Sequence, residues 1–288
     1  MTEILKGAAV VAAMNEATTA LVEVLTAQGA RPTLVIVRVG EREDAVAYAR
    51  GATRRCEQVG VVVRELILPD DCSQAELVAA IQQLNSDDTA HGVLLLRPLP
   101  THIDDDTARN TLAPHKDIDG ITDASVVGVF TGEDRGFNPC TPQACLEILD
   151  HYGIEIAGRR VVVIGRSLVV GKPVAHMLLA RNATVTIAHS RTADLPSVVR
   201  EADIVVACVG RAGMVGIEHL SPGQIVIDVG INVLTDGSLA GDVDFASAQE
   251  IVSAITPVPG GVGTVTTSVL VKHVAQAAKK TQARIIKA

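Results

Sequence analysis

The stretch VVVIGRSLVVGKP, residues 161–173, decides the fold of this 288-residue chain. Four consecutive β-branched residues end at Gly165, and Gly171 then precedes Lys172 and Pro173. Because proline is tolerated in the first turn of a helix, the stretch predicts a strand, a turn and a helix that begins near Gly171 or Lys172. A helix start at the end of a strand is an anion-binding site. The G-x-G-x-x-G spacing is absent, so an ordinary strand-to-helix turn is the alternative.

The residues that follow repeat the strand–helix order. Buried strands that alternate with helices are typical of a doubly wound parallel sheet. We therefore expect an α/β domain with strands at 159–165, 183–189, 202–210 and 223–230, and with helices near 143–152, 172–181 and 195–201.

The first part of the chain shows a similar alternation. It predicts helices at 8–28, 44–58 and 73–85, and strands at 32–40, 61–68 and 92–100. An irregular, Pro/Gly-rich stretch runs to residues 138–142 and marks the boundary. A long final helix, Thr266–Lys280, has no strand after it, so we expect it to pack back on the first domain. The predicted domains are residues 1–139 with 265–288, and residues 140–264.

Composition excludes several classes of protein. The net charge of −8, from 25 basic and 33 acidic residues, argues against a general nucleic-acid binder. The five cysteines form no C-x-x-C pair and no cluster with histidine at ligand spacing, so we expect reduced thiols, a cytoplasmic protein and no metal. The N-terminus does not resemble a signal peptide, and no uninterrupted apolar run of about 18 residues occurs, so we expect no membrane span.

The end of the second strand of the doubly wound domain indicates the cofactor. NAD-binding sheets usually place an acid there to bind the ribose hydroxyls. This chain has His189, Ser190 and Arg191 instead, and Arg166 adds a second cation in the first turn. Cations suit the extra phosphate of NADP, which an acid would repel. The plainer alternative is that these side chains are solvated charges on the surface. We predict NADP as the cofactor.

Six motifs together closely resemble one family. They are VVVIGRSLVVGKP, ATVTIAHSRT, IVIDVGIN, ITPVPGGVGTVT, PHKDIDG and PCTP. The chain resembles the bifunctional methylenetetrahydrofolate dehydrogenase/cyclohydrolase family over nearly its whole length. The resemblance implies an N-terminal α/β folate domain and a Rossmann-like NADP-binding domain, with both ligands in the cleft between them. It also implies a cytoplasmic homodimer.

The resemblance assigns site residues. Asp119 corresponds to the aspartate that holds the pterin ring, a task that suits a carboxylate because it accepts paired N–H groups; a loop cap is the alternative. Tyr48 corresponds to the tyrosine that stacks on the substrate, and these two are the expected catalytic, substrate-positioning residues. Further expected substrate contacts are Leu95, Leu96, Arg97, Pro259, Gly260 and Gly261. Expected cofactor contacts are Gly165, Arg166, Ser167, Gly171, His189, Ser190, Arg191, Gly230 and Ile231.

The sequence departs from the family pattern at residues that serve the attack of water in that family. The family's helix reads Y-V-x-x-K, and Ala52 stands at the lysine, on the same helical face as Tyr48. The family's strand reads G-[IV]-L-V-Q-L-P-L-P, so Leu96 stands at the supporting glutamine and Arg97 at a leucine. Ala45 stands where the family usually has serine. Because neighbouring strand residues point to opposite faces, Arg97 does not simply replace the glutamine, unless the strand slips before its proline.

These departures predict a divided activity. Removal of a hydride from the methylene carbon mainly requires the protein to position the substrate and the cofactor. Attack of water on the methenyl product needs a group that exchanges protons, which alanine and leucine cannot do. We therefore predict an NADP-dependent methylenetetrahydrofolate dehydrogenase with weak or absent cyclohydrolase activity. The alternatives are the full bifunctional enzyme, with Arg97 or a water assisting, a non-catalytic NADP- or folate-binding paralogue, and an enzyme of a different one-carbon carrier.

Overall fold

The computed structural model describes residues 1–287 and divides the chain into two compact units. We name the two units after the ligands that the resemblance implies: residues 1–12 with 141–266 are the nucleotide unit, and residues 13–140 with 267–288 are the folate unit. The first twelve residues belong to the nucleotide unit because β1 (Glu3–Ile4) pairs in parallel with β11 (Ala254–Ile255). The predicted boundaries had placed those residues in the other domain.

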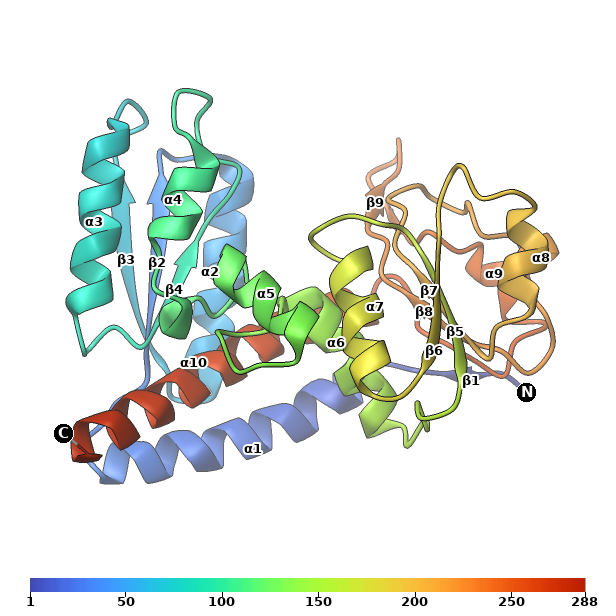
Figure 1. The fold of residues 1–288 in the computed structure, drawn as a ribbon, viewed down its shortest axis with the longest axis horizontal. Helices are drawn as coiled ribbons and strands as arrows, with labels where there is room; N and C mark the ends of the chain where they lie inside the picture. The colour runs from blue at the N-terminus through green and yellow to red at the C-terminus, as the bar shows by residue number, and fades with distance from the viewer. Residues whose placement is uncertain (288) are drawn as a thin grey trace. The chain divides into compact units, whose positions relative to one another are not determined.

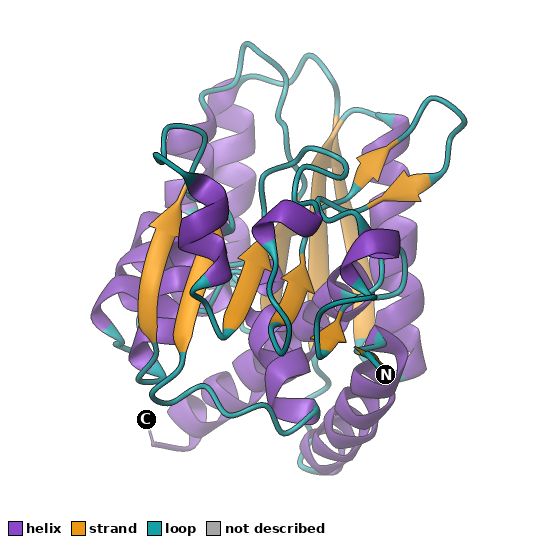
Figure 2. Cartoon of the chain, turned by 90° about the vertical axis from the view of Figure 1, so that its right-hand side faces the viewer, coloured by secondary structure: helices purple, strands orange, loops and turns teal. Residues whose placement is uncertain are grey.

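The nucleotide unit is built on a six-stranded parallel sheet with the order β1-β11-β8-β7-β5-β6, drawn in orange in Figure 2. Its main strands are β5 (Arg160–Ile164), β6 (Thr184–Ala188), β7 (Ile204–Ala207) and β8 (Ile225–Asp228). The chain runs from β5 to β6 on one side and then to β7 on the other side of β5. The direction of winding therefore reverses at β5, and ligands of doubly wound sheets bind beyond the carboxyl ends of the strands at such a point.

Helices and short segments complete the nucleotide unit. They are α6 (Cys140–His151), α7 (Gly171–Ala180), α8 (Leu195–Arg200), η2 (Ile217–His219), α9 (Phe245–Ala248) and the hairpin β9 (Asn232–Val233) with β10 (Leu239–Ala240). Helix α7 begins at Gly171, as the opening stretch predicts. Helix α6 begins three residues before the predicted start. The aliphatic core under the helices includes Val162, Val205 and Val226 from three neighbouring strands.

The folate unit contains a three-stranded parallel sheet of order β3-β2-β4. Its strands are β2 (Thr33–Val39), β3 (Val62–Leu68) and β4 (Gly92–Leu95), and every residue of the central β2 is buried. The prediction of a strand to residue 100 was wrong beyond Leu95. Pro98 and Pro100 lack the N–H groups that a strand ladder needs.

The helices of the folate unit include α2 (Glu43–Gln58), α3 (Gln74–Ser86), α4 (Asp105–Thr111), η1 (Pro114–Lys116) and α5 (Asp123–Thr131). Helix α5 lies where the sequence analysis expected an irregular stretch. The side chain of Thr122 accepts a hydrogen bond from Ser125 N and caps α5, and Gly132 ends it with a φ of 74°. The predicted two-domain α/β class, with a doubly wound sheet, is confirmed.

Two long helices, α1 (Gly7–Ala27) and α10 (Val262–Lys287), run side by side in the folate unit from Ala13 and from Thr267 (Figure 1). Gln282 Nε2 donates to the carbonyl of Gln28, the residue that follows α1. The expected packing of the C-terminal helix on the first domain is confirmed. Helix α10 is longer than predicted at both ends.

Helix α1 is long and apolar enough to cross a membrane, by length and composition alone. Core helices of soluble proteins pass the same test, so this is weak evidence. The buried residues of α1 recur every three or four positions, which is the spacing of a helix that packs one face on a protein core. They are Gly7, Val10, Val11, Met14, Thr18, Val22 and Leu25.

Candidate functional sites

The turn after β5 is shaped by two glycines. Gly165 has a φ of 137°, and a Cβ atom there would lie 2.3 Å from the carbonyl oxygen of Cys208, at the end of β7. A Cβ atom at Gly171 would lie 2.4 Å from the carbonyl oxygen of Gly165. Only glycine fits these contacts, so the first turn of α7 packs directly on the strand end. The N-terminus of α7 is therefore held at the carboxyl edge of the sheet.

The polar residues of this edge divide into two groups. Ser167 Oγ accepts hydrogen bonds from Val170 N at 3.1 Å and Gly171 N at 3.3 Å, so it shapes the turn. His189 Nδ1 accepts from Arg191 N at 3.1 Å and shapes the turn after β6 in the same way. Arg166, Ser190 and Arg191 remain exposed.

These exposed residues fit a phosphorylated dinucleotide. Ile164 and Ala188 are partners in the β5–β6 ladder, so the turns that carry Arg166 and Arg191 follow adjacent strand ends. Residues 189–191 include no carboxylate, and guanidinium groups bind phosphate in a bidentate manner. The donor set therefore suits the 2′-phosphate of NADP better than the free ribose hydroxyls of NAD.

A pair of buried carboxylates, which the sequence analysis missed, ties the neighbouring loops together. Asp242 accepts hydrogen bonds from Val209 N, Gly210 N and Arg211 N at 2.6–2.9 Å, and from Asn232 Nδ2 at 3.0 Å. Asp228, at the end of β8, accepts from the backbone N–H groups of Gly230, Asp242 and Val243. Burial raises the pKa of Asp228 to about 6. The sequence signal for this network is limited to the two short segments that contain these aspartates, I-D-V-G-I-N and G-D-V.

The network fixes two predicted residues. A Cβ atom at Gly230 would lie 2.3 Å from Asp242 Oδ1, so this position accepts only glycine. Ile231, next to it, is exposed, and its Cδ1 lies 2.9 Å from where a Cβ atom of Gly263 would stand.

The P-V-P-G-G turn lies in the same unit, with Pro259 and Gly260 exposed. Gly260 has a φ of 102°, and its carbonyl accepts a hydrogen bond from Gly7 N at 2.8 Å. A Cβ atom at Gly261 would lie 2.4 Å from the carbonyl oxygen of Pro257. The turn is therefore pinned by backbone contacts on both sides.

The folate unit holds the second cluster of predicted residues, around the P-H-K-D-I-D-G loop. Lys116 is buried and donates to the carbonyls of Leu84 and Asp87, both at 2.6 Å. Asp117 caps the next turn, because it accepts from Ile121 N, Thr122 N and Ser125 Oγ. The loop-cap alternative thus describes Asp117 rather than Asp119.

Asp119 lies among groups from several elements. The Cys140 thiol hydrogen-bonds to its carboxylate and also lies 3.3 Å from the carbonyl oxygen of Ile118. Desolvation raises the pKa of Asp119 to about 6; the Cys140 hydrogen bond lowers it, Asp117 raises it and Arg97 lowers it. Desolvation also raises the pKa of Tyr48, with further contributions from Asp119 and Cys140. Tyr48 and Arg97 are thus coupled electrostatically to Asp119, and so is Cys140, to which the sequence analysis gave no role.

His273, on α10, lies beside Cys140. Its Nδ1 lies 2.8 Å from the carbonyl oxygen of Ile118 and 3.9 Å from the Cys140 sulfur. Its ring packs 4.9 Å from the ring of Phe137. Burial raises the pKa of the Cys140 thiol well above its usual range, so this cysteine is a neutral partner for Asp119.

Two of the three positions that the resemblance marks as departures, Ala52 and Leu96, are buried. Ala52 is 1% exposed and Leu96 is 8% exposed, whereas Tyr48, one turn before Ala52, is 42% exposed. Ala45 is half-buried on the same helix. Leu95 packs within the core of the folate unit. Neither sealed position offers a group that accepts or donates a proton.

Arg97 does not enter the space of the expected glutamine. Its guanidinium binds the Asp105 carboxylate in a bidentate manner, with Nε 2.7 Å from Oδ1 and a second contact from Nη2 to Oδ2. Asp105 belongs to the acidic run 104–106. Its neighbours have separate roles, since Asp104 caps α4 and Asp106 pairs with Arg109.

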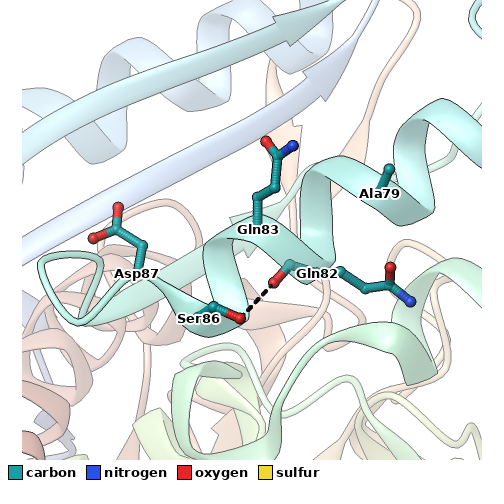
Figure 3. A pocket seen from close by; sticks show the side chains of 5 residues that line it. All are labelled: Ala79, Gln82, Gln83, Ser86 and Asp87. Carbon is teal, nitrogen blue, oxygen red and sulfur yellow. Dashed lines mark hydrogen bonds between the residues drawn. The ribbon is translucent and has the colours of Figure 1, made fainter.

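An open hollow lies along α3 and the residue that follows it (Figure 3). It is lined by Ala79, Gln82, Gln83, Ser86 and Asp87. Ser86 Oγ donates to the carbonyl of Gln82, and the Asp87 carboxylate is paired with Arg64. The polar groups of the hollow are thus partly satisfied within the protein.

Comparison with known families identifies both parts of the chain. A family model described as the catalytic domain of tetrahydrofolate dehydrogenase/cyclohydrolase matches residues 5–119. A second, described as the NAD(P)-binding domain of tetrahydrofolate dehydrogenase/cyclohydrolase, matches residues 139–282.

Individual proteins are similar over the whole length. The chain is 45% identical to the bifunctional protein FolD of Clostridioides difficile, over 96% of each chain. It is 48% identical to FolD of Carboxydothermus hydrogenoformans, over 96% of this chain and 97% of that one.

Solved structures agree. The bifunctional FolD enzyme of Campylobacter jejuni superposes with a TM-score of 0.94 at 36% identity, and covers 97% of this chain and 99% of its own. The Trypanosoma brucei enzyme, solved with NADP and an inhibitor, gives a TM-score of 0.89 at 35% identity, over 100% of this chain and 99% of its own.

Proposed function

Because the chain belongs to the tetrahydrofolate dehydrogenase/cyclohydrolase family, we propose that it oxidises methylenetetrahydrofolate to methenyltetrahydrofolate with NADP, and that it hydrolyses the methenyl product weakly or not at all. The observation that supports weak hydrolysis is the burial of Ala52 and Leu96, which stand at the positions of the family's lysine and glutamine.

The nucleotide unit supplies the cofactor site. NADP, when bound, accepts the hydride that leaves the methylene carbon. The N-terminus of α7 and the exposed Arg166 and Arg191 bind its phosphates. Gly230 and Ile231 shape the loop after β8, and Asp242 holds that loop to the loop after β7.

The folate unit positions the substrate. Asp119 accepts the N–H groups of the pterin ring, and the exposed ring of Tyr48 provides a flat surface for stacking. Oxidation requires no proton transfer by these side chains, so positioning is their main contribution.

Hydration of the methenyl group has different requirements. Water must be activated and a ring nitrogen must be protonated, and a suitably placed acid–base group contributes a rate factor of about 10²–10⁴. Alanine and leucine at positions 52 and 96 exclude water and exchange no protons. Arg97 does not replace them, because guanidinium groups stay protonated and its fork is bound to Asp105.

One observation favours the second candidate, the full bifunctional enzyme. Asp119 has a pKa of about 6, which is close enough to neutrality for proton exchange. We assign Asp119 to pterin binding, which occupies its carboxylate, and therefore prefer the dehydrogenase.

A single assay separates the candidates. The purified protein is mixed with methylenetetrahydrofolate and NADP, and the absorbances of NADPH and of the methenyl product are followed together. We expect both to accumulate. Methenyl decay faster than the uncatalysed rate would establish the bifunctional enzyme, and no signal with NADP or NAD would indicate a binding protein or an enzyme of another one-carbon carrier.

We further propose a cytoplasmic homodimer, as the family resemblance implies. Light scattering coupled to size-exclusion chromatography tests this assembly, and the mass of a single 30.1-kDa chain would contradict it.

A further inference from the structure

Lys116 ties the loop that precedes Asp119 to the end of helix α3. Its side chain is only 1% exposed, and lysine is almost never buried without partners. The ammonium group donates to the carbonyl oxygens of Leu84, in the last turn of α3, and of Asp87, its C-cap, both at 2.6 Å. The last carbonyls of a helix lack intrahelical donors and carry partial negative charge, so a buried cation is favourable there.

Asp117, the next residue, is tied to a different helix. Its side chain is fully buried and accepts hydrogen bonds from Ile121 N, Thr122 N and Ser125 Oγ at 2.6–3.0 Å. Thr122 is the N-cap of α5, so the carboxylate lies at a helix N-terminus, where negative charge is favourable. Two neighbouring side chains of opposite charge thus bind the ends of two different helices.

Asp119 belongs to a closed turn that begins at Asp117. Gly120 N donates to the carbonyl of Asp117 at 3.2 Å, which closes the four-residue turn. Gly120 has a φ of 69°, and a Cβ atom there would lie 2.6 Å from the backbone nitrogen of the residue before α6, so the turn packs directly on that segment. The carbonyl oxygen of Ile118 lies 2.8 Å from Nδ1 of His273 on α10. Because the other three residues of the turn are held, the position of Asp119 follows from theirs.

We propose that Lys116 and Asp117 are positioning residues for the substrate: they hold the turn in the conformation that presents the Asp119 carboxylate to the pterin ring. A turn that is ordered before the ligand arrives lowers the entropic cost of binding. If one anchor is lost, the turn samples other conformations, and the apparent affinity falls with the fraction that stays competent. The inference rests on the proposed function, in particular on pterin binding by Asp119.

The Lys116→Met variant tests the inference, because it removes the ammonium group and keeps most of the apolar stem. We expect the tetrahydrofolate affinity to fall and the KM for methylenetetrahydrofolate to rise by about tenfold, as when about one tenth of the molecules keep the competent turn. The kcat should change by less than about threefold, because substrate that does bind lies in the same place. NADP affinity should stay the same, because the expected cofactor residues lie in the nucleotide unit. Initial rates of NADPH formation and calorimetric titrations of the folded protein measure these quantities.

Three further variants separate positioning from stability. Asp117→Asn loses one acceptor at the start of α5 and should change affinity and KM in the same direction. In an Asp119→Asn background, Lys116→Met should cause little further loss, because it acts through Asp119. Val22→Ala is the matched control: Val22 is buried on α1 beside Gly60, beyond the end of α2. It should lower stability through lost packing and leave affinity and KM unchanged.

Hydrogen exchange of the free wild-type protein provides a measurement that needs no variant. The amides of Gly120, Ile121 and Thr122, which all donate to Asp117, should exchange at least about a hundredfold more slowly than in the unfolded chain. If Lys116→Met does not fold, this measurement and Asp117→Asn decide the question. Exchange at the unfolded rate would overturn the inference, because the turn would not be held before binding.

The remaining outcomes are also distinct. Wild-type affinity and KM in folded Lys116→Met would overturn the inference, as would an equal fall in NADP affinity, an equal fall in Val22→Ala, or an undiminished further loss in the Asp119→Asn background. If the wild type forms no NADPH and binds no tetrahydrofolate, the proposed function itself fails, and the inference fails with it.

Discussion

Asp119 is a carboxyl group whose burial opposes its own charge. Its pKa of about 6 in the folded protein exceeds the ordinary value of 3.8, mainly because of desolvation. A group whose pKa is raised on folding destabilises the native state when it is ionised, so the cost is present above about pH 6 and disappears as the pH falls toward 4. A residue that lowers stability in this way is typical of a binding site rather than of a core.

The Asp119→Asn variant tests this conflict between stability and function. At about pH 8 we expect its free energy of unfolding to rise by at most about 3 kcal/mol, because the buried charge is gone, and the gain to vanish near pH 4. Tetrahydrofolate affinity should fall at least about tenfold, because an amide cannot accept both pterin N–H groups. Urea unfolding and calorimetry measure the two quantities. Asp106→Asn, at an exposed carboxylate, should change neither; a less stable Asp119→Asn protein at pH 8 would contradict the account.

At the scale of elements, the proposed division of activity depends on α2 and on the residues that follow β4. Helix α2 carries Tyr48 and Ala52 one turn apart. Leu96 directly follows β4 and precedes Arg97. The stacking surface is present, but the two positions that serve water chemistry in the family are apolar and sealed. On the proposed assignment, these two elements keep the side chain that stacks on the substrate and lack the side chains that would support hydration.

Restoring both side chains should restore hydration. We expect the double variant Ala52→Lys, Leu96→Gln to accelerate methenyl decay by about tenfold or more, below the full 10²–10⁴ because its surroundings are not adapted. Burying two polar groups should cost about 1–3 kcal/mol of stability. Methenyl absorbance after mixing measures the rate. Arg54→Lys, an exposed substitution on α2, is the control, and a double variant that folds but shows no faster decay would contradict the assignment.

At the scale of the whole molecule, each compact unit gathers its site from loops that are distant in sequence. In the nucleotide unit, Asp242 receives four donors from the loops after β7 and β8. Those loops follow adjacent parallel strands, so their position relative to each other depends on this carboxylate as well as on the sheet. Loss of Asp242 leaves several N–H groups without an acceptor.

The Asp242→Ala variant should therefore lose about 3 kcal/mol or more of stability, because each orphaned buried donor costs about 1–3 kcal/mol. We also expect NADP affinity to fall in calorimetric titration of the folded fraction. Asp242→Asn keeps one acceptor oxygen, so its stability and NADP affinity should lie between those of Asp242→Ala and those of the wild type. Asp236→Ala, at an exposed carboxylate in the β9–β10 hairpin, should leave both quantities unchanged. Unaltered NADP affinity in a folded Asp242→Ala protein would show that the network does not shape the cofactor site.

Local sequence accounts for most of the elements and for part of the candidate sites. The V-V-V-I-G turn predicted the start of α7, because a β-branched run, a glycine and a proline each act within a few residues. Helix α5 was missed because Val126, Val127, Gly128 and Val129 are weak helix formers. Its cap and its packing compensate for that weakness, and both depend on the surrounding fold.

The sequence by itself determined the α/β class and the family, since these follow from local pattern and from the resemblance of its motifs, and it is the source of the prediction at positions 52 and 96. Only the tertiary structure decided which polar residue of each motif is consumed by the fold and which remains for a ligand: Ser167, His189 and Asp117 hold turns, whereas Arg166, Arg191 and Asp119 do not. It also supplied the partners Cys140, Asp105 and Asp242. The physical reason is that these contacts join loops at the ends of strands, and the strand order that brings such loops together is a property of the folded sheet rather than of any local segment.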